Sequence, residues 1–385
     1  MTKYIDIFVA HYGWQGVALA AAILLLFGVQ MWYYAYAYGR IAKYKTSRRM
    51  SRLEAEPPLS VVVPMFSENM PYVEQSLPLL LGQEYGDFQV VVVYVGGDSD
   101  FYAELSALQG AYANLTTTKI EYNPRFPISV KMALNVGIKS ARHEHVVLTT
   151  TDAVPATPHW LSMMAKGFTK AEIVLGYCGI EPAEGFARRT MRTDRMMESA
   201  AWIAAAIRRH PYRGIRHNLG LTKSIYFGTN GFNHLNMNIG EDDLYLQSVM
   251  TPDNTCVMLS PRSLVVEHPW GGLRWWAERR RHYGMAEALY PTAAKRQMHR
   301  ESDSRLLFFA SVLTALIFMP VEYKAAAGAL LLIRYAAAVT TVRRIARRLG
   351  ERKITKLYLL YDLLSPLCNL ALRMTMVRKD RTVWR

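Results

Sequence analysis

The feature that most constrains the fold is an uncharged stretch near the N-terminus, residues 17–38 (VALAAAILLLFGVQMWYYAYAY). About 20 apolar residues in an α-helix span the hydrocarbon core of a bilayer. Tyrosine and tryptophan gather in the second half of the stretch, as they do at a membrane interface. Six basic residues and no acidic residue follow between positions 40 and 52, so the positive-inside rule places the following domain in the cytoplasm.

A cleaved signal peptide is the alternative interpretation of this stretch, because Ala35-Tyr36-Ala37 has the form of a cleavage site. A signal peptide carries its positive charge before the apolar run, whereas here the charge follows it. We therefore expect a retained anchor at residues 1–40 and a basic juxtamembrane linker at residues 41–56.

Residues 301–385 contain further membrane signals. Two apolar runs, residues 306–319 and 325–342, are separated by the short polar segment PVEYK and followed by a basic cluster at residues 343–353. This pattern predicts a hairpin that returns to the cytoplasm, although the first arm is short for a full crossing. Arg334 within the second arm must reach the interface or face other protein groups.

The last run, residues 354–375, contains Asp362, Pro366 and Arg373. We therefore expect it to be interfacial or re-entrant and not a full span. The basic clusters of the chain flank these membrane segments, where they would contact anionic lipid head groups. They do not alternate with aromatic residues as in a nucleic-acid groove, so nucleic acid is not an expected partner.

The overall composition agrees with one soluble domain plus membrane segments. Of the 385 residues, 51% are hydrophobic and they are spread unevenly, and the formal net charge is +15. The three cysteines are far apart and form no zinc-binding or disulfide pattern. A reducing compartment is the simpler expectation.

Residues 57–300 are predicted to form an α/β domain. Short β-branched runs alternate with helix-like segments at residues 71–81 and 130–140, and the nearly continuous apolar character of the runs predicts a mostly parallel sheet covered on both faces. The expected strands are residues 59–63, 88–95, 118–122, 146–149 and 173–177. Neither a P-loop nor a G-x-G-x-x-G fingerprint occurs in this region.

Carboxylates follow several of these predicted strands. Glu68 lies shortly after the first strand, Asp98 and Asp100 after the second, and Asp152 after the fourth. Ligands of parallel α/β sheets bind beyond the carboxyl ends of the strands, so this edge is the expected site. Taken alone, Asp152 also fits a helix cap, and Asp98 and Asp100 also fit solvated loop charges.

The order of several motifs resembles the family-2 glycosyltransferases, which have the GT-A fold and include the catalytic domains of cellulose and hyaluronan synthases. The resemblance covers about residues 57–290. The matching segments are SVVVPMFSEN at residues 60–69, KMALNVGI at 131–138, VLTTTDAVP at 147–155, FGTNGF at 227–232, GEDDL at 240–244 and ERRRH at 278–282.

The resemblance implies a nucleotide diphosphate sugar as donor and Mg2+ or Mn2+ as cofactor, since a divalent cation would bridge the donor phosphates. Thr150-Thr151-Asp152 stands at the place of the family's D-x-D motif, so Asp152 is the expected metal ligand and Thr150 a neutral helper. Pro64 and Glu68 would lie beside the nucleoside, and Lys131 near the diphosphate.

The second-strand loop departs from the family pattern, which leaves the base of the donor undefined. Where the family has D-D-G-S-T-D, this chain has Val95-Gly96-Gly97-Asp98-Ser99-Asp100. The usual base-binding acid is missing, and Asp98 would have to substitute from a shifted position, with Asp100 close by.

The general base is expected in the Glu241-Asp242-Asp243 triplet, because the acceptor hydroxyl must lose a proton as it attacks. The family pattern selects Asp242, with Asp243 as the alternative. Three acids in a row also fit a helix N-terminus.

A basic and aromatic segment follows at residues 270–282. By the register of the family's Q-x-x-R-W motif, Arg281 would contact the donor diphosphate and His282 replaces the tryptophan. The tryptophans Trp270, Trp275 and Trp276 would form the acceptor side near the membrane. Arg279 fits equally well as a ligand of lipid phosphates.

Together these features predict an inverting membrane glycosyltransferase of cell-envelope glycan synthesis, with Asp242 as base and a lipid-linked or membrane-proximal acceptor. Three C-terminal segments are too few for an obvious polysaccharide channel, so single addition is preferred to processive synthesis. The alternative is a non-catalytic membrane scaffold that has kept the fold. The sequence leaves the donor sugar, the linkage and the oligomeric state open.

Overall fold

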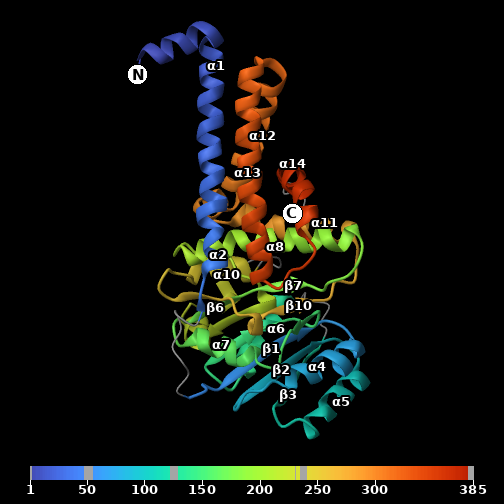
Figure 1. The fold of residues 1–385 in the computed structure, drawn as a ribbon. Coiled ribbons are helices and arrows are strands. Elements are labelled where there is room, and N and C mark those ends of the chain that lie inside the picture. The colour runs from blue at the N-terminus through green and yellow to red at the C-terminus, as the bar shows by residue number, and fades with distance from the viewer. Residues whose placement is uncertain (1, 47–54, 122–128, 230, 235–240, 380–385) are drawn as a thin grey trace.

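The computed structural model describes residues 2–46, 55–121, 129–229, 231–234 and 241–379 (Figure 1). An α/β domain carries two sheets, and helices from both ends of the chain project together from one side of it. The predicted mixed α/β domain with a mostly parallel sheet is confirmed.

The central sheet has seven strands in the order β3-β2-β1-β4-β8-β6-β9. Strand β8 is antiparallel to both of its neighbours, and the other pairings are parallel. Every residue of β1 and β2 is buried, as expected for apolar strands covered on both faces. The strands are β1 Leu59–Met65, β2 Phe88–Val95, β3 Leu115–Ile120, β4 His145–Leu148, β6 Ile173–Gly176, β8 Leu219–Thr222 and β9 Thr255–Met258.

Strand β3 begins three residues earlier than the predicted strand at residues 118–122. Its pairing with β2 sets Leu115 beside Val90 and buries the Leu115 side chain, so burial of this residue extends the strand toward its N-terminus. The end of the predicted strand, residue 122, lies outside the described residues.

Helices cover both faces of the sheet. Helix α6 packs on β1 and β2, and a Cβ on its Gly137 would lie 2.4 Å from Val62 Cγ1, so glycine permits the close approach. The helices of the domain are η2 Tyr72–Ser76, α4 Leu77–Leu81, α5 Ser99–Ala107, η3 Leu108–Gly110, α6 Val130–Ser140, α7 Trp160–Phe168, α8 Phe186–Ile207, η4 Arg216–Asn218, α9 Lys223–Gly228, η5 Gly231–His234, α10 Glu241–Val249, η6 Pro261–Ser263, α11 Leu273–Ala286 and η7 Glu287–Leu289.

A small second sheet joins segments that are distant in the sequence. Strand β10 (Val265–Glu267) lies between β5 (Ala153–Pro155) and β7 (Cys178–Ile180), antiparallel to the first and parallel to the second. The register sets Glu267 opposite Ala153, which directly follows Asp152. This sheet therefore brings the end of β10 to the end of β4.

The remaining helices are α1 Thr2–Met31, η1 Trp32–Ala37, α2 Gly39–Lys43, α12 Thr292–Phe318, α13 Val321–Arg348 and α14 Thr355–Lys379. Among the described residues, two helical segments are long and apolar enough to cross a membrane, Ala10–Lys43 and Val321–Arg348. The first predicted hairpin arm forms the apolar second half of α12, whose first half is polar. In Figure 1, α1, α12 and α13 rise side by side from the domain, and α14 lies near α11.

A buried ionic cluster links these helices. Asp362 of α14 forms ion pairs with Arg334 of α13 and, at 2.8 Å, with Arg305 of α12, and the hydroxyls of Tyr34 and Tyr358 donate hydrogen bonds to it. Arg334 is 0% exposed, so this residue faces protein groups, one of the two arrangements expected from its place in the sequence. Asp362 thus pairs with two buried guanidinium groups, of which Arg305 also lies 3.4 Å from Glu301.

The substitution Asp362→Asn is expected to destabilise the protein by about 3–5 kcal/mol, because removing one partner of a buried ion pair leaves an uncompensated charge. Thermal unfolding in detergent should show a clearly lower midpoint. Asp303→Asn is the matched control, since its partly exposed pair with Arg373 contributes about 0–1 kcal/mol. Equal midpoints for the two variants would contradict the structural role of Asp362.

Candidate active site

The first component of the site is the segment that follows β4. Asp152 lies between β4 and β5, and the Thr150 hydroxyl donates a hydrogen bond to Asp152 Oδ1. Thr149 is buried at the end of β4, and its hydroxyl donates to the backbone oxygen of His217 at 3.1 Å. The predicted metal ligand and its helper thus lie at the carboxyl edge of the sheet.

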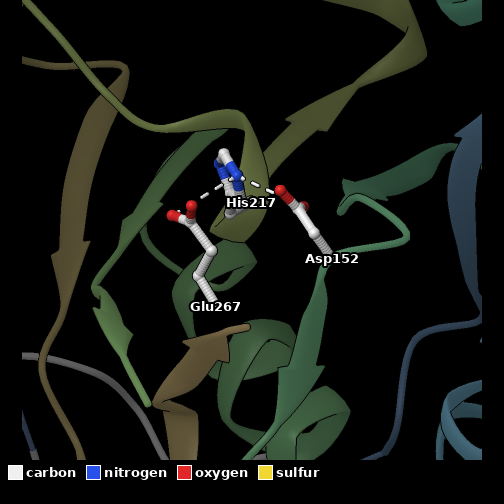
Figure 2. Close-up of side chains that lie close together, drawn as sticks. All are labelled: Asp152, His217 and Glu267. Atoms are coloured by element: carbon white, nitrogen blue, oxygen red, sulfur yellow. Dashed lines mark ion pairs between the residues drawn. The ribbon is translucent and has the colours of Figure 1, made fainter. Parts of the chain in front are cut away.

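His217 and Glu267 reach the same place from two other segments. Because β8 is antiparallel, its N-terminal end lies at this edge, with Leu219 beside Leu148, and His217 comes just before it. His217 Nε2 lies 3.5 Å from Asp152 Oδ1 and 3.7 Å from Glu267 Oε2. Figure 2 shows the imidazole between the two carboxylates, with the three side chains directed toward one another. We call these three residues the acid–histidine cluster.

Two arginines contact this cluster. Arg195 of α8 lies 2.7 Å from Glu267 Oε2, and Arg279 of α11 forms an ion pair with Glu267 Oε1 and lies 3.2 Å from His217 Nε2. Burial alone would raise the pKa of Asp152, but the contacts with His217 and Arg279 and the hydrogen bond from Thr150 outweigh it and hold that pKa below its usual range. Asp152 is therefore an ionised ligand at neutral pH.

The cluster fits a divalent cation. One ligand atom from each of Asp152, His217 and Glu267 can be chosen so that all lie within 4.8 Å of one another. His217 Nε2 faces both carboxylates, and in the neutral imidazole that carries its proton on Nδ1, the Nε2 lone pair could bind a cation in place of the Arg279 contact. Carboxylate oxygens and an imidazole nitrogen are common ligands of divalent cations. The two arginines on Glu267 leave Asp152 and His217 as the principal ligands.

The candidate bases line a cavity that also reaches the cluster. This cavity has a volume of about 620 Å³, and its walls include Asp242, Asp243, His217 and Arg279. Asp242 is 7% exposed and lies 4.0 Å from Arg216. Helix α10 begins at Glu241 as predicted, and the side chain of Glu241 lies outside the described residues.

Asp243 has partners that Asp242 lacks. Its Oδ2 lies 2.9 Å from Arg213 Nε and accepts a hydrogen bond from the Tyr290 hydroxyl at 2.6 Å. Burial and the neighbouring Asp242 raise the pKa of Asp243 to about 7, although Arg213 lowers it. Asp243 is thus fixed by structural contacts, whereas Asp242 faces the cavity with one distant cation.

The raised pKa of Asp243 predicts a pH dependence of stability. Between about pH 4, the usual value, and about pH 7, the folded state holds a proton that the unfolded state has lost, so the free energy of unfolding falls as pH rises. The difference reaches about 4 kcal/mol at most, at 1.36 kcal/mol for each pKa unit. Thermal unfolding between pH 4.5 and 7.5 should therefore show a shallower fall for Asp243→Asn than for the wild type. Identical slopes would contradict the assignment.

The residues predicted to hold the nucleoside lie around β1 and β2. Pro64 is buried within β1, and Glu68 follows this strand and accepts a hydrogen bond from the Tyr94 hydroxyl. Asp98 accepts from the backbone N–H groups of Asp100 and Phe101 at 2.9 and 3.0 Å, so it caps α5, with Asp100 exposed in the first turn. Asp98 is therefore a helix cap and not the solvated loop charge that the sequence had suggested as its structural role.

Lys131 lies in the first turn of α6, at the start of the motif that includes Gly137. The Ser129 side chain accepts from the Met132 N–H and caps the start of this helix. Its contact with a donor diphosphate stays a prediction.

Helix α11 presents its aromatic and basic residues in several directions. Trp276 is buried and donates to Asp194 Oδ2 at 2.8 Å, whereas Trp270 is 82% exposed and lies outside the cavity. Trp275 is partly buried and packs against Trp276. Arg280 forms an ion pair with Asp194 at 2.7 Å.

The arginine of α11 that contacts the acid–histidine cluster is Arg279. In the part of the chain that the structure describes, the Nε of Arg281 is buried and has no hydrogen-bond partner. The side chain of His282 lies outside the described residues. A role of Arg281 at the donor diphosphate stays a prediction, and Arg279 is the additional candidate.

Three residues of the site were not singled out in the sequence: His217, Glu267 and Arg195. Glu267 carries the same signal that led to Asp152, a carboxylate at the end of an apolar strand. His217 precedes its strand, so a search of the residues after each strand misses it. Arg195 lies within a long helix and gives no local signal.

No protein-family model and no curated protein matches the sequence. Among solved structures, the chain is similar to the mannosyltransferase PcManGT from Pyrobaculum calidifontis in complex with GDP-Man and Mn2+, with a TM-score of 0.53 and 20% identity over 90% of this chain and 98% of that one. It is also similar to S. aureus TarS 1–349, with a TM-score of 0.42 and 15% identity over 85% and 93%. At such identities, the likeness to PcManGT shows the fold alone: this chain has a glycosyltransferase fold of the GT-A type.

Proposed function

We propose that this protein transfers a sugar from a nucleotide diphosphate donor to an acceptor at the membrane. The observation that carries the proposal is the acid–histidine cluster with Arg279 at the carboxyl edge of the sheet, in the wall of the same cavity as Asp242. Ligands of α/β sheets bind at this edge. The site thus combines groups for binding a diphosphate with a carboxylate for deprotonating an acceptor.

The donor half of the site contains groups that would bind a negatively charged diphosphate. Asp152 and His217 would hold a divalent cation, which when bound neutralises the charge that develops on the leaving diphosphate. Arg279 offers a planar guanidinium suited to phosphate oxygens, and Lys131 a more flexible charge. Glu267 holds Arg195 and Arg279 in position through its two oxygens.

The acceptor half depends on Asp242. Its carboxylate takes the proton of the acceptor hydroxyl as that oxygen attacks the anomeric carbon from the face opposite the diphosphate. A single displacement of this kind inverts the anomeric configuration and needs no covalent intermediate. We infer family-2 membership and an inverting mechanism from the motif order and this arrangement.

The two apolar helical segments support a membrane setting for this reaction. The two apolar helical segments would anchor the protein, and the basic residues after residue 38 favour a cytoplasmic domain on anionic lipid. An acceptor that is lipid-linked or close to the membrane fits a site beside these helices.

Purified protein in detergent tests the proposal, with release of nucleoside diphosphate from a panel of nucleotide sugars measured in Mn2+ or Mg2+. GDP-mannose is the first donor to try, because PcManGT, which has this fold, is described in complex with GDP-Man and Mn2+. We expect release with at least one donor. Absence of release with every donor, for wild type and Asp242→Asn alike, would favour the non-catalytic scaffold.

A further inference from the structure

The cavity has a second polar region, formed by residues other than the acid–histidine cluster. Nine arginines and six acidic residues line the cavity as a whole, which leaves an excess of positive charge. Most of these arginines are paired with acids, including Arg195, Arg213, Arg279, Arg280 and Arg305. The positive charge that could bind an anionic ligand must therefore come from the other arginines of the cavity wall.

Arg208, Arg296 and Arg300 provide this charge. Among the described residues, none of the three guanidinium groups forms an ion pair with a carboxylate. Arg208 lies over the ring of Trp32 at 4.8 Å, and Arg296 and Arg300 are exposed in the first turns of α12. We call these residues the arginine mouth of the cavity.

Three elements meet at the arginine mouth. The backbone oxygen of His210, just after α8, accepts a hydrogen bond from Gln297 of α12 at 3.1 Å. Trp32 and Tyr33 of η1 line the same cavity as Arg208 and Arg300, and Arg208 lies over the Trp32 ring. The mouth thus lies where the N-terminal apolar helix enters the domain, at the level expected for lipid head groups.

We propose that the arginine mouth binds the phosphate or diphosphate of a lipid-linked sugar acceptor, whose sugar hydroxyl reaches Asp242 in the same cavity. Arginine is suited to phosphate because its guanidinium donates two parallel hydrogen bonds. The aromatic residues Trp32 and Tyr33 give the mouth an amphipathic wall for the start of a lipid chain. The inference rests on the proposed transfer reaction and specifies its acceptor class.

The position of the phosphate distinguishes two kinds of acceptor. If a lipid phosphate were itself the nucleophile, it would need no base and would lie beside the donor at Asp152. With the phosphate bound at the arginine mouth instead, a sugar attached to it would occupy the part of the cavity between the mouth and Asp242. The acceptor is therefore a glycosylated lipid phosphate, not the bare lipid phosphate.

Binding of farnesyl diphosphate to the detergent-purified full chain tests the site separately from activity. The titration is done in EDTA, so that a diphosphate gains nothing from a cation at Asp152. We expect Arg296→Gln/Arg300→Gln to weaken binding by about tenfold or more, as expected for lost charged hydrogen bonds. Arg343→Gln/Arg344→Gln, which removes two exposed arginines outside the cavity, should leave binding unchanged.

Farnesol and an anionic phospholipid complete the experiment. Farnesol should bind at least about tenfold more weakly than farnesyl diphosphate, and lysophosphatidylglycerol should not compete. Unchanged binding in the double variant, or equal competition by the phospholipid, would overturn the proposal, the latter by revealing a general head-group site. Nucleoside diphosphate binding with Mn2+, measured on the same samples, reports separately on the proposed transfer reaction.

Discussion

Replacing Asp242 by asparagine is expected to lower kcat by about 10²–10⁴-fold, the usual contribution of a positioned general base. Asparagine has nearly the same shape as aspartate but cannot accept the acceptor proton. Asp242 does not belong to the acid–histidine cluster, so the KM for the donor should change little. Initial rates of nucleoside diphosphate release at saturating acceptor measure the effect.

The control for this variant is Asp253→Asn. Asp253 pairs with Arg209 on the surface, with both side chains largely exposed, and it does not line the cavity. Its removal should leave turnover at the wild-type rate. If Asp242→Asn also kept the wild-type rate, Asp242 would not be the base, and Asp243 would be the next candidate.

Replacing Asp152 by asparagine is expected to lower Mn2+-dependent turnover by roughly 100-fold or more, since even partners that only orient metal ligands contribute about 10–100-fold. The variant loses the charged oxygen that faces His217. Excess Mn2+ should restore part of the activity, because the remaining ligands still bind weakly. Turnover as a function of Mn2+ concentration measures both effects.

Glu181→Gln is the matched control for Asp152→Asn. Glu181 also pairs with a histidine, His268, at 3.2 Å, but both side chains are about half exposed and neither belongs to the cluster. Its Mn2+ dependence should equal that of the wild type. A wild-type Mn2+ dependence in Asp152→Asn would place the cation elsewhere.

The sequence predicted the general architecture because the strands carry an unambiguous signal. The run at residues 88–95 is apolar apart from Gln89, and it matches β2 at both ends. Helix α6 likewise has the predicted bounds, since Ser129 caps its start. The strand β3 begins in a threonine-rich segment, where burial against β2 and not local composition determines the boundary.

The site was predicted only in part because one strand runs the other way. Residues that follow parallel strands reach one edge of the sheet, and this rule led to Asp152. The antiparallel β8 brings its first residues to that edge, so His217 was missed. Strand direction is a property of the whole sheet and is absent from any local pattern.

The orientation of the arginines on α11 is a second property that the local sequence does not determine. Arg279 contacts the acid–histidine cluster, whereas the family motif had drawn attention to Arg281. The two residues are separated by about 200° around a helix, so they cannot face the same group. Motif register selected Arg281, whereas the docking of α11 on Glu267 directs Arg279 to the cluster. That docking depends on Trp276 and Arg280 holding Asp194 of α8, contacts between segments more than 80 positions apart.

The most direct test of the proposed activity is the anomalous signal of Mn2+ in crystals grown with Mn2+ and a nucleoside diphosphate. We predict a peak within coordination distance of Asp152 and His217, with the diphosphate bound to the ion and close to Arg279. A diphosphate bound away from Asp152, His217 and Arg279 would contradict the assignment of this cluster as the donor site.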